Sequence, residues 1–225
     1  MAALIAAVCY SSFLLSRWTH SAPSASGGFV SELEAPGQPY AWLYRSSDVL
    51  AGLGILAAAW TLRPLIRGHR WSTAAVVLLA LTAAGSVVDG ATTMSCDPGS
   101  NAQCAQHEHT VGGLLGQLAA LHTDSGLLGF AASAIGAVML GAVLADRWPS
   151  WGRLQIALGT AMGGCGIADI AVLLASGDIG SIERVRVLAT SGWFLVIGLF
   201  LLSQHATTPA HTRRDLPANG QKVAS

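Results

Sequence analysis

The chain has 225 residues, of which 52% are hydrophobic and only 11% are charged, with 12 Lys and Arg residues balanced by 12 Asp and Glu residues. A soluble domain usually carries about 25% charged residues, so this composition argues against a soluble enzyme and against a disordered chain. The zero net charge excludes recognition of nucleic acid through a basic face. The composition predicts a polytopic membrane protein whose main partner is the lipid bilayer.

Six segments with few or no charges are long enough to cross a bilayer core, which takes roughly 20 residues of helix. In chain order, we expect helices over residues 2–18, 46–66, 72–90, 121–145, 152–176 and 183–203. Together they predict one transmembrane domain over residues 1–203, an all-α bundle of six helices. The polar tail, residues 204–225, is expected to be disordered in the cytoplasm.

The first segment also has the features of a signal peptide. Residues 1–16 carry no charge, and the small residues 22–26 resemble a cleavage site. A signal peptide has basic residues before its apolar run, whereas the first basic residue here is Arg17, which follows that run. An uncleaved transmembrane helix is therefore favoured.

The arginines and the single lysine predict the orientation. Cytoplasmic loops of membrane proteins are enriched in Lys and Arg. Eight of these residues fall on one side of the predicted bundle and four on the other, Arg17, Arg45, Arg184 and Arg186. The distribution predicts a cell-membrane protein with both termini in the cytoplasm. The larger group comprises Arg63, Arg67, Arg70, Arg147, Arg153, Arg213, Arg214 and Lys222.

Acidic residues and one histidine gather at the outer ends of the predicted helices. Asp48 opens the second helix, Asp89 closes the third, and His122 and Asp124 open the fourth. Asp169 lies roughly 22 Å above the start of the fifth helix at 1.5 Å per residue. A carboxylate within the bilayer costs several kcal/mol unless it is paired, protonated or hydrated. We therefore expect these side chains to line one outward-facing polar cavity in the outer leaflet, beneath the extracellular loops. Asp48, His122, Asp124 and Asp169 are the candidate catalytic residues.

Each of these carboxylates has a second interpretation, in which it caps its own helix or pairs with a nearby arginine in headgroup water. Asp48 fits this interpretation well, because Arg45 precedes it by about one turn and Ser46 and Ser47 can cap the helix. Asp169 fits it least, because it lies far from the predicted helix ends.

The predicted outer loop contains Cys96 and Cys104. On an oxidising face of the membrane, two cysteines at this spacing favour a disulfide. His107 and His109 follow, and with the cysteines they are candidate zinc ligands, although the spacing is not that of a zinc finger. Free thiols are the third possibility, and the sequence identifies no cofactor.

The stretch Ser31-Glu32-Leu33-Glu34-Ala35-Pro36-Gly37, followed by a helix that opens at Asp48, resembles a bacterial family of six-helix membrane proteins, the domain of unknown function 998 family. So does an outer loop with Cys96-Asp97 and Cys104, followed by a helix that opens near His122. The resemblance covers about residues 1–203 and implies a six-helix bundle without an established activity. It implies that Glu32, Asp48, Asp97 and His122 are characteristic polar positions. It also implies that the first outer loop folds over the cavity mouth. The predicted binding residues are then Glu32, Ser47, Asp48, Asp89, His122 and Asp169.

Three functions agree with these observations. The first is an enzyme or lipid-handling protein that acts on an amphiphile from the outer leaflet. The second is a small-solute or proton-coupled transporter that uses Asp169, and the third is an accessory subunit without a site of its own. A carrier needs polar groups that continue to the inner side, and the inner halves of these helices are almost entirely apolar. The first function is therefore favoured.

Small residues of the fifth helix, such as Gly159 and Gly163, are expected to pack within the bundle, with a homodimer as the alternative.

Overall fold

The computed structural model describes residues 1–19, 29–92, 103, 121–175 and 180–206, and this part of the chain contains helices and no strand. Five helices are long and apolar enough to cross a membrane. The N-terminal helical pair, which is bent by 44°, is the sixth candidate if it counts as one span. These findings confirm the predicted all-α membrane fold. The five are α3 (Ala41–Leu65), α4 (Ser72–Ala91), α7 (Leu121–Ala145), α8 (Pro149–Leu174) and α9 (Gly180–Ala206).

The N-terminal pair is bent at two consecutive serines. It comprises α1 (Ala2–Tyr10), the 3-10 helix η1 (Ser12–Leu15) and α2 (Ser16–Thr19). The Ser11 hydroxyl donates a hydrogen bond to the Ala7 carbonyl at 2.8 Å, a side-chain bond that competes with the backbone ladder and bends helices. The bend leaves Tyr10 with its ring edge against Phe194 of α9, at a centroid distance of 5.4 Å.

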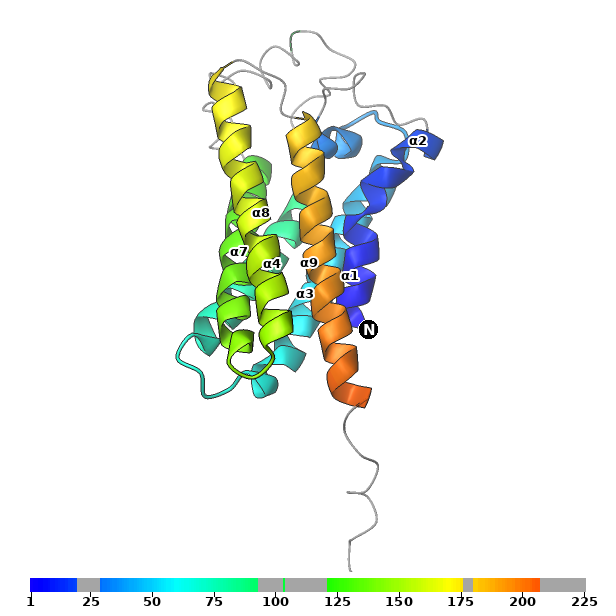
Figure 1. Ribbon diagram of the computed structural model, residues 1–225. Coiled ribbons are helices and arrows are strands. Elements are labelled where there is room, and N and C mark those ends of the chain that lie inside the picture. The colour runs from blue at the N-terminus through cyan, green and yellow to red at the C-terminus, as the bar shows by residue number, and fades with distance from the viewer. Residues whose placement is uncertain (20–28, 93–102, 104–120, 176–179, 207–225) are drawn as a thin grey trace, which may run out of the picture.

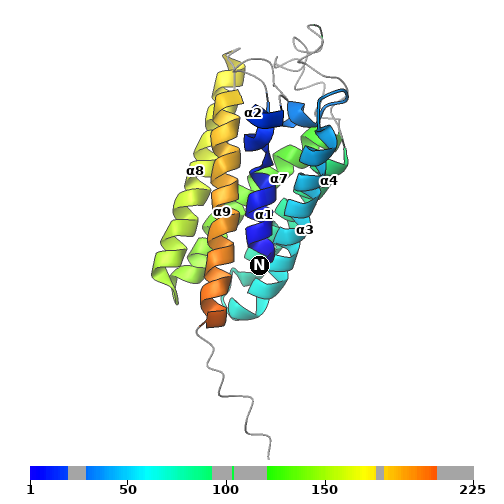
Figure 2. The ribbon, with the colours of Figure 1, turned by 90° about the vertical axis from the view of Figure 1, so that its right-hand side faces the viewer.

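The helices form a closed ring in which each packs against its neighbours in the sequence. The contacts run from α1 to α3, α4, α7, α8 and α9, and α9 packs back against α1. Figure 2 shows α1 beside α9 and α3. The start of α1 and the end of α9 lie at the same end of the ring, opposite the 3-10 helix η2 (Val30–Glu34) (Figure 1). We call the end that carries η2 the η2 end.

Small residues allow close approach between neighbouring helices. A Cβ atom on Gly85 of α4 would lie 2.7 Å from the Gly129 Cα atom of α7, and one on Gly159 of α8 would lie 2.7 Å from the Ala134 carbonyl oxygen. The predicted role in bundle packing therefore fits Gly159. It does not fit Gly163, where a Cβ atom would meet nothing within 4 Å.

Three helices begin before the residues expected from hydropathy, because a helix can extend beyond its apolar run. A turn with positive φ angles at Gly37 (93°) and Tyr40 (60°) starts α3 at Ala41 rather than at residue 46. Pro149, a residue type favoured in the first helical turn, begins α8 ahead of residue 152. Asp169 consequently lies roughly 30 Å along α8 at 1.5 Å per residue, closer to the η2 end than the predicted 22 Å. Similarly, α9 begins at Gly180 rather than at residue 183 and continues to Ala206, and residues 207–225 of the predicted tail lie outside the described residues.

Candidate functional site

Four carboxyl groups from four elements line one cavity at the η2 end. They belong to Glu34 of η2, Asp48 of α3, Asp89 of α4 and Glu183 of α9. The cavity encloses about 430 Å³ of space not filled by atoms, including the part open to solvent. We call it the acidic cavity, and the other described residues that line it are Tyr10, Ser12, Phe13, Val30, Ser31, Leu33, Tyr44, Phe130 and Val187.

Glu34 and Asp48 share a hydrogen bond between their side chains. Two carboxyl groups can form such a bond only when one of them is protonated. Burial, together with the negative charges of Asp48 and Asp89, raises the pKa of Glu34 well above its usual value, and the hydrogen bond to Asp48 acts in the same direction. Arg45 opposes these effects. Glu34 is therefore the protonated partner, and its second oxygen, Oε2, is buried without a hydrogen-bond partner among the described residues.

Arg45 does not form the ion pair with Asp48 that the sequence allowed. Its guanidinium group donates hydrogen bonds to the carbonyl oxygens of Gly90 at 3.1 Å and Ala91 at 3.0 Å. These carbonyls belong to the last turn of α4, where a cation is favoured by the helix dipole. Arg45 therefore joins α3 to α4, while Asp48 faces the carboxyl group of Glu34.

Glu183 joins η2 to α9. Its Oε2 atom accepts a hydrogen bond from the Val30 backbone N–H at 2.9 Å. This bond holds the start of η2 over the first turn of α9, so that the loop before α3 contributes to the acidic cavity. The family resemblance implies that the first outer loop folds over the cavity mouth, and the hydrogen bond between Val30 and Glu183 places part of this loop against α9.

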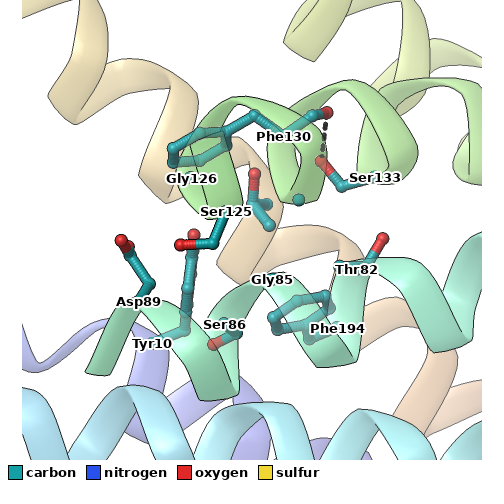
Figure 3. Close-up of a pocket in the computed structure, with 12 residues that line it drawn as sticks. Tyr10, Thr82, Gly85, Ser86, Asp89, Ser125, Gly126, Phe130, Ser133 and Phe194 are labelled. Carbon is teal, nitrogen blue, oxygen red and sulfur yellow. Dashed lines mark hydrogen bonds between the residues drawn. The ribbon is translucent and has the colours of Figure 1, made fainter. Parts of the chain in front are cut away.

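A second cavity lies deeper in the ring and shares Tyr10, Asp89 and Phe130 with the first. Figure 3 shows hydroxyl groups around it, and we call it the hydroxyl cavity. Thr82 and Ser133 donate hydrogen bonds to backbone carbonyls of their own helices, at 3.0 Å and 2.8 Å. Because these hydroxyl protons are already donated, the hydroxyl oxygens can only accept hydrogen bonds from a ligand. The hydroxyl residues that line this cavity are Tyr10, Thr82, Ser86, Ser125, Ser133 and Thr190.

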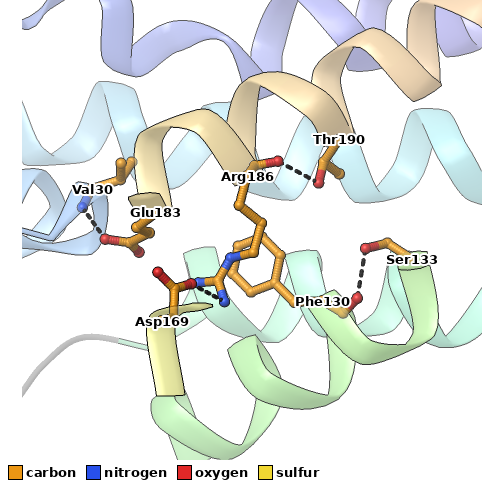
Figure 4. A network of polar contacts seen from close by, with 7 residues as sticks. All are labelled: Val30, Phe130, Ser133, Asp169, Glu183, Arg186 and Thr190. Carbon is orange, nitrogen blue, oxygen red and sulfur yellow. Dashed lines mark hydrogen bonds and ion pairs between the residues drawn. The ribbon is translucent and has the colours of Figure 1, made fainter. Parts of the chain in front are cut away.

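Asp169 is buried and paired with an arginine of the next helix. The Arg186 Nη1 atom lies 2.7 Å from Asp169 Oδ2, with the two side chains 14% and 7% exposed. The guanidinium group lies over the Phe130 ring, 4.0 Å from the ring centre (Figure 4). Arg186 also interacts electrostatically with Glu183. Asp169 therefore neutralises Arg186 beside the acidic cavity, and it does not itself line that cavity.

The other predicted site residues do not all lie in the acidic cavity. Asp48 and Asp89 line one cavity, whereas Ser47 and Glu32 are buried and do not line it. Glu32 instead accepts a hydrogen bond from the Phe29 backbone N–H at 3.0 Å. The side chains of His122 and Asp124, in the first turn of α7, lie outside the described part of the structure, as do Cys96, Asp97, Cys104, His107 and His109. The predicted disulfide therefore remains a prediction.

Among the described residues, no three His, Cys, Asp or Glu side chains are placed to hold a metal ion. Cys9 and Cys165, the cysteines within described helices, are free thiols.

Sequence reasoning did not select Glu34, Glu183 or Arg186 as site residues. Two signals in the sequence point to them. Glu183 and Arg186 are three residues apart and therefore share a helix face. Glu34 closes a short acidic segment with the apolar Leu33 at its centre, and Leu33 is buried with it.

Residues 3–199 match the model of one protein family, whose description is Protein of unknown function (DUF998). The chain belongs to this family. The resemblance seen in the sequence is thereby confirmed. No curated protein and no solved structure matches the chain.

The raised pKa of Glu34 predicts how stability depends on pH. A carboxyl group whose pKa is higher in the folded state contributes its full stability at acidic pH, and this contribution is lost as the pH rises through the folded-state pKa. Glutamine mimics the neutral acid and cannot ionise. We expect Glu34→Gln to match the wild type at about pH 4 and to be more stable at about pH 8, with a gap that grows by roughly 1.4 kcal/mol per pH unit up to the folded-state pKa.

Thermal unfolding in detergent across this pH range measures the effect, with about 2–4 °C expected for each kcal/mol. Asp146→Asn is the control, since it removes an exposed carboxylate at the opposite end and should give a curve parallel to the wild type. A constant difference between Glu34→Gln and wild type at every pH would contradict the shared proton.

The ion pair between Asp169 and Arg186 predicts a large loss of stability when one partner is removed. Asp169→Asn leaves the buried guanidinium group uncompensated, which costs about 3–5 kcal/mol. Arg186→Met should cost a similar amount, and the double variant should lose much less than the sum.

Thermal unfolding of the four proteins in the cycle gives the coupling energy between the two residues. Asp146→Asn breaks an exposed pair with His69, whose atoms are 3.5 Å apart, and should cost less than about 1 kcal/mol. Strict additivity of the two single substitutions would show that the pair carries no interaction energy.

Proposed function

We propose that this member of the DUF998 family binds the polar head of an amphiphile in the acidic cavity, from the outer face of the cell membrane. The observation that carries the proposal is that Glu34, Asp48, Asp89 and Glu183 line one cavity although they come from four separate elements. Buried carboxyl groups are expensive in a membrane protein and are found mostly where they act on a ligand, an ion or a proton.

The outward direction of the cavity is part of the proposal. It assumes that the bent N-terminal pair crosses the membrane as one span, which gives six crossings and both termini on one side. Arg63, Arg67 and Arg70 lie at or beside the turn between α3 and α4, away from η2, and Arg147 lies in the turn between α7 and α8. The positive-inside rule favours a cytoplasmic location for these turns, so the η2 end faces outward.

The transporter alternative is weakened by the packing below the cavities. The core of the ring there is made of apolar side chains such as Ile55, Leu79, Leu140 and Phe200, all fully buried. A path for a solute needs polar groups or water across the whole bilayer. Gln155, a buried polar residue near the start of α8, accepts a hydrogen bond from the Trp193 indole N–H. Its oxygen is therefore already engaged within the protein.

An amphiphile suits this arrangement better than a free solute. The cavity lies at the η2 end of a ring whose outer surface is rich in exposed apolar side chains, such as Ile167, Ile170 and Leu174 of α8. A ligand with a polar head and an alkyl chain satisfies both environments, because the head reaches the carboxyl groups while the chain stays in lipid.

Binding of dodecyl amphiphiles to the protein in nanodiscs of neutral lipid tests this proposal. The probes are dodecyltrimethylammonium, dodecyl maltoside and dodecyl sulfate. Ser31→Trp fills the acidic cavity, since Ser31 lines it, while Pro36→Trp adds the same ring to an exposed position of the same loop outside it. We expect saturable binding of at least one probe to the wild type. Ser31→Trp should abolish this binding, whereas Pro36→Trp should change the Kd by no more than about twofold, which is less than 0.5 kcal/mol.

Equal effects of the two tryptophan variants would contradict the proposal. So would the absence of saturable binding for all three probes.

A further inference from the structure

We propose that the acidic cavity is a site for an ammonium head group, so that the amphiphile it takes is cationic at its polar end. This inference rests on the proposed function and adds the chemical class of the ligand. It follows from three features of the cavity lining, which are its carboxyl groups without a Lys or Arg side chain among them, its aromatic rings, and one buried carboxyl oxygen without a hydrogen-bond partner among the described residues.

The first feature is the imbalance of charge. The described residues that line the acidic cavity include four carboxyl groups and no Lys or Arg side chain. Arg45 and Arg186 interact electrostatically with Glu34 and Glu183, but their hydrogen bonds and ion pair go to groups outside the lining, the carbonyl oxygens of Gly90 and Ala91 for Arg45 and Asp169 for Arg186. A cationic group in the cavity would supply the missing positive charge, whereas an anion would be repelled.

The second feature is the set of aromatic side chains among the carboxyl groups. Tyr10, Phe13, Tyr44 and Phe130 line the acidic cavity, and they come from three separate parts of the chain. The negative face of an aromatic ring attracts a cation, and aromatic cages recognise alkylated ammonium groups in particular. Arg186 over Phe130, at 4.0 Å from the ring centre, shows that one of these rings already holds a cation on its surface.

The third feature is an oxygen atom that accepts nothing. Glu34 is only 5% exposed, and its Oε2 atom has no hydrogen-bond partner among the described residues although the side chain lines the cavity. A buried acceptor without a donor costs about 1–3 kcal/mol. The Thr82 and Ser133 hydroxyl groups of the adjoining cavity have already donated their protons. The described lining of the acidic cavity therefore has no Lys or Arg side chain to balance its carboxyl groups. An ammonium group supplies the positive charge and, unless it is fully alkylated, also a hydrogen-bond donor.

The same nanodisc measurement at about pH 8 tests the head-group class, because release of the Glu34 proton when a cation binds is easier at high pH. We expect dodecyltrimethylammonium to bind at least about tenfold more tightly than dodecyl maltoside, with no saturable binding of dodecyl sulfate; tenfold corresponds to 1.4 kcal/mol. Tetramethylammonium, which has the same head without the chain, should compete only at much higher concentration.

Two variants separate the contributions of charge and ring. Glu34→Gln keeps the shape of the side chain but cannot release a proton to leave a carboxylate beside the bound cation. It should weaken dodecyltrimethylammonium binding about tenfold. Tyr44→Leu removes a ring face and should weaken it several-fold, while Tyr44→Phe keeps the face and should bind within about twofold of wild type.

The outcomes distinguish the two proposals. Binding of dodecyl maltoside or dodecyl sulfate that Ser31→Trp abolishes, without binding of the ammonium probe, overturns the head-group class and leaves the amphiphile site standing. Tetramethylammonium binding as tight as that of the dodecyl probe keeps the ammonium site and overturns the amphiphile. No saturable binding of any probe overturns both, and wild-type affinity in both Glu34→Gln and Tyr44→Leu overturns the site assignment.

Discussion

A carboxyl group inside a ring of apolar helices must be neutralised by a proton, a cation or a backbone donor, and the η2 end uses all three. Glu34 keeps its proton and donates a hydrogen bond to the carboxyl group of Asp48. Asp169 is neutralised by Arg186, and Glu183 accepts from the Val30 backbone. Because these partners belong to η2, α3, α8 and α9, neutralising the carboxyl groups also fixes how the loop and helices meet. Removing the carboxyl groups would remove the contacts that close this end of the ring.

One carboxyl oxygen at this end, Glu34 Oε2, is buried without a hydrogen-bond partner among the described residues. Sequences optimised for stability leave no buried acceptor unpaired, and exceptions concentrate where a protein binds or reacts. Glu34 Oε2 is such an exception, and it belongs to the cavity that is also lined by Tyr10, Phe13, Tyr44 and Phe130. The opposite half of the ring is packed mainly with apolar side chains such as Ile55, Leu79 and Leu140, and Gln155 Nε2 is also buried there without a hydrogen-bond partner among the described residues. The concentration of buried carboxyl groups at the η2 end is the reason for proposing that the ligand binds there.

The helices were predictable from the sequence and the partners of the carboxyl groups were not. Hydropathy identifies spans such as α4 and α7 because apolar length alone determines what crosses a bilayer. The direction that Asp48 faces depends instead on the rotation of α3 and on where η2 docks, which are set by long-range contacts. Arg45 is an example. Its spacing in the sequence fits an ion pair with Asp48, but in the structure it donates hydrogen bonds to the carbonyl oxygens at the end of α4. Asp169 could be recognised as buried, yet its partner Arg186 lies on a different helix.

The central claim is that the acidic cavity faces the outside of the cell. Labelling with a membrane-impermeant maleimide in intact cells measures this directly, in a chain whose native cysteines are replaced by serine. Ser31→Cys introduces a thiol at the cavity lining, and Arg67→Cys introduces one at the exposed turn between α3 and α4. The account predicts that Ser31→Cys is labelled in intact cells and that Arg67→Cys is labelled only after the membrane is permeabilised. Labelling of Arg67→Cys in intact cells, with Ser31→Cys protected until permeabilisation, would contradict it.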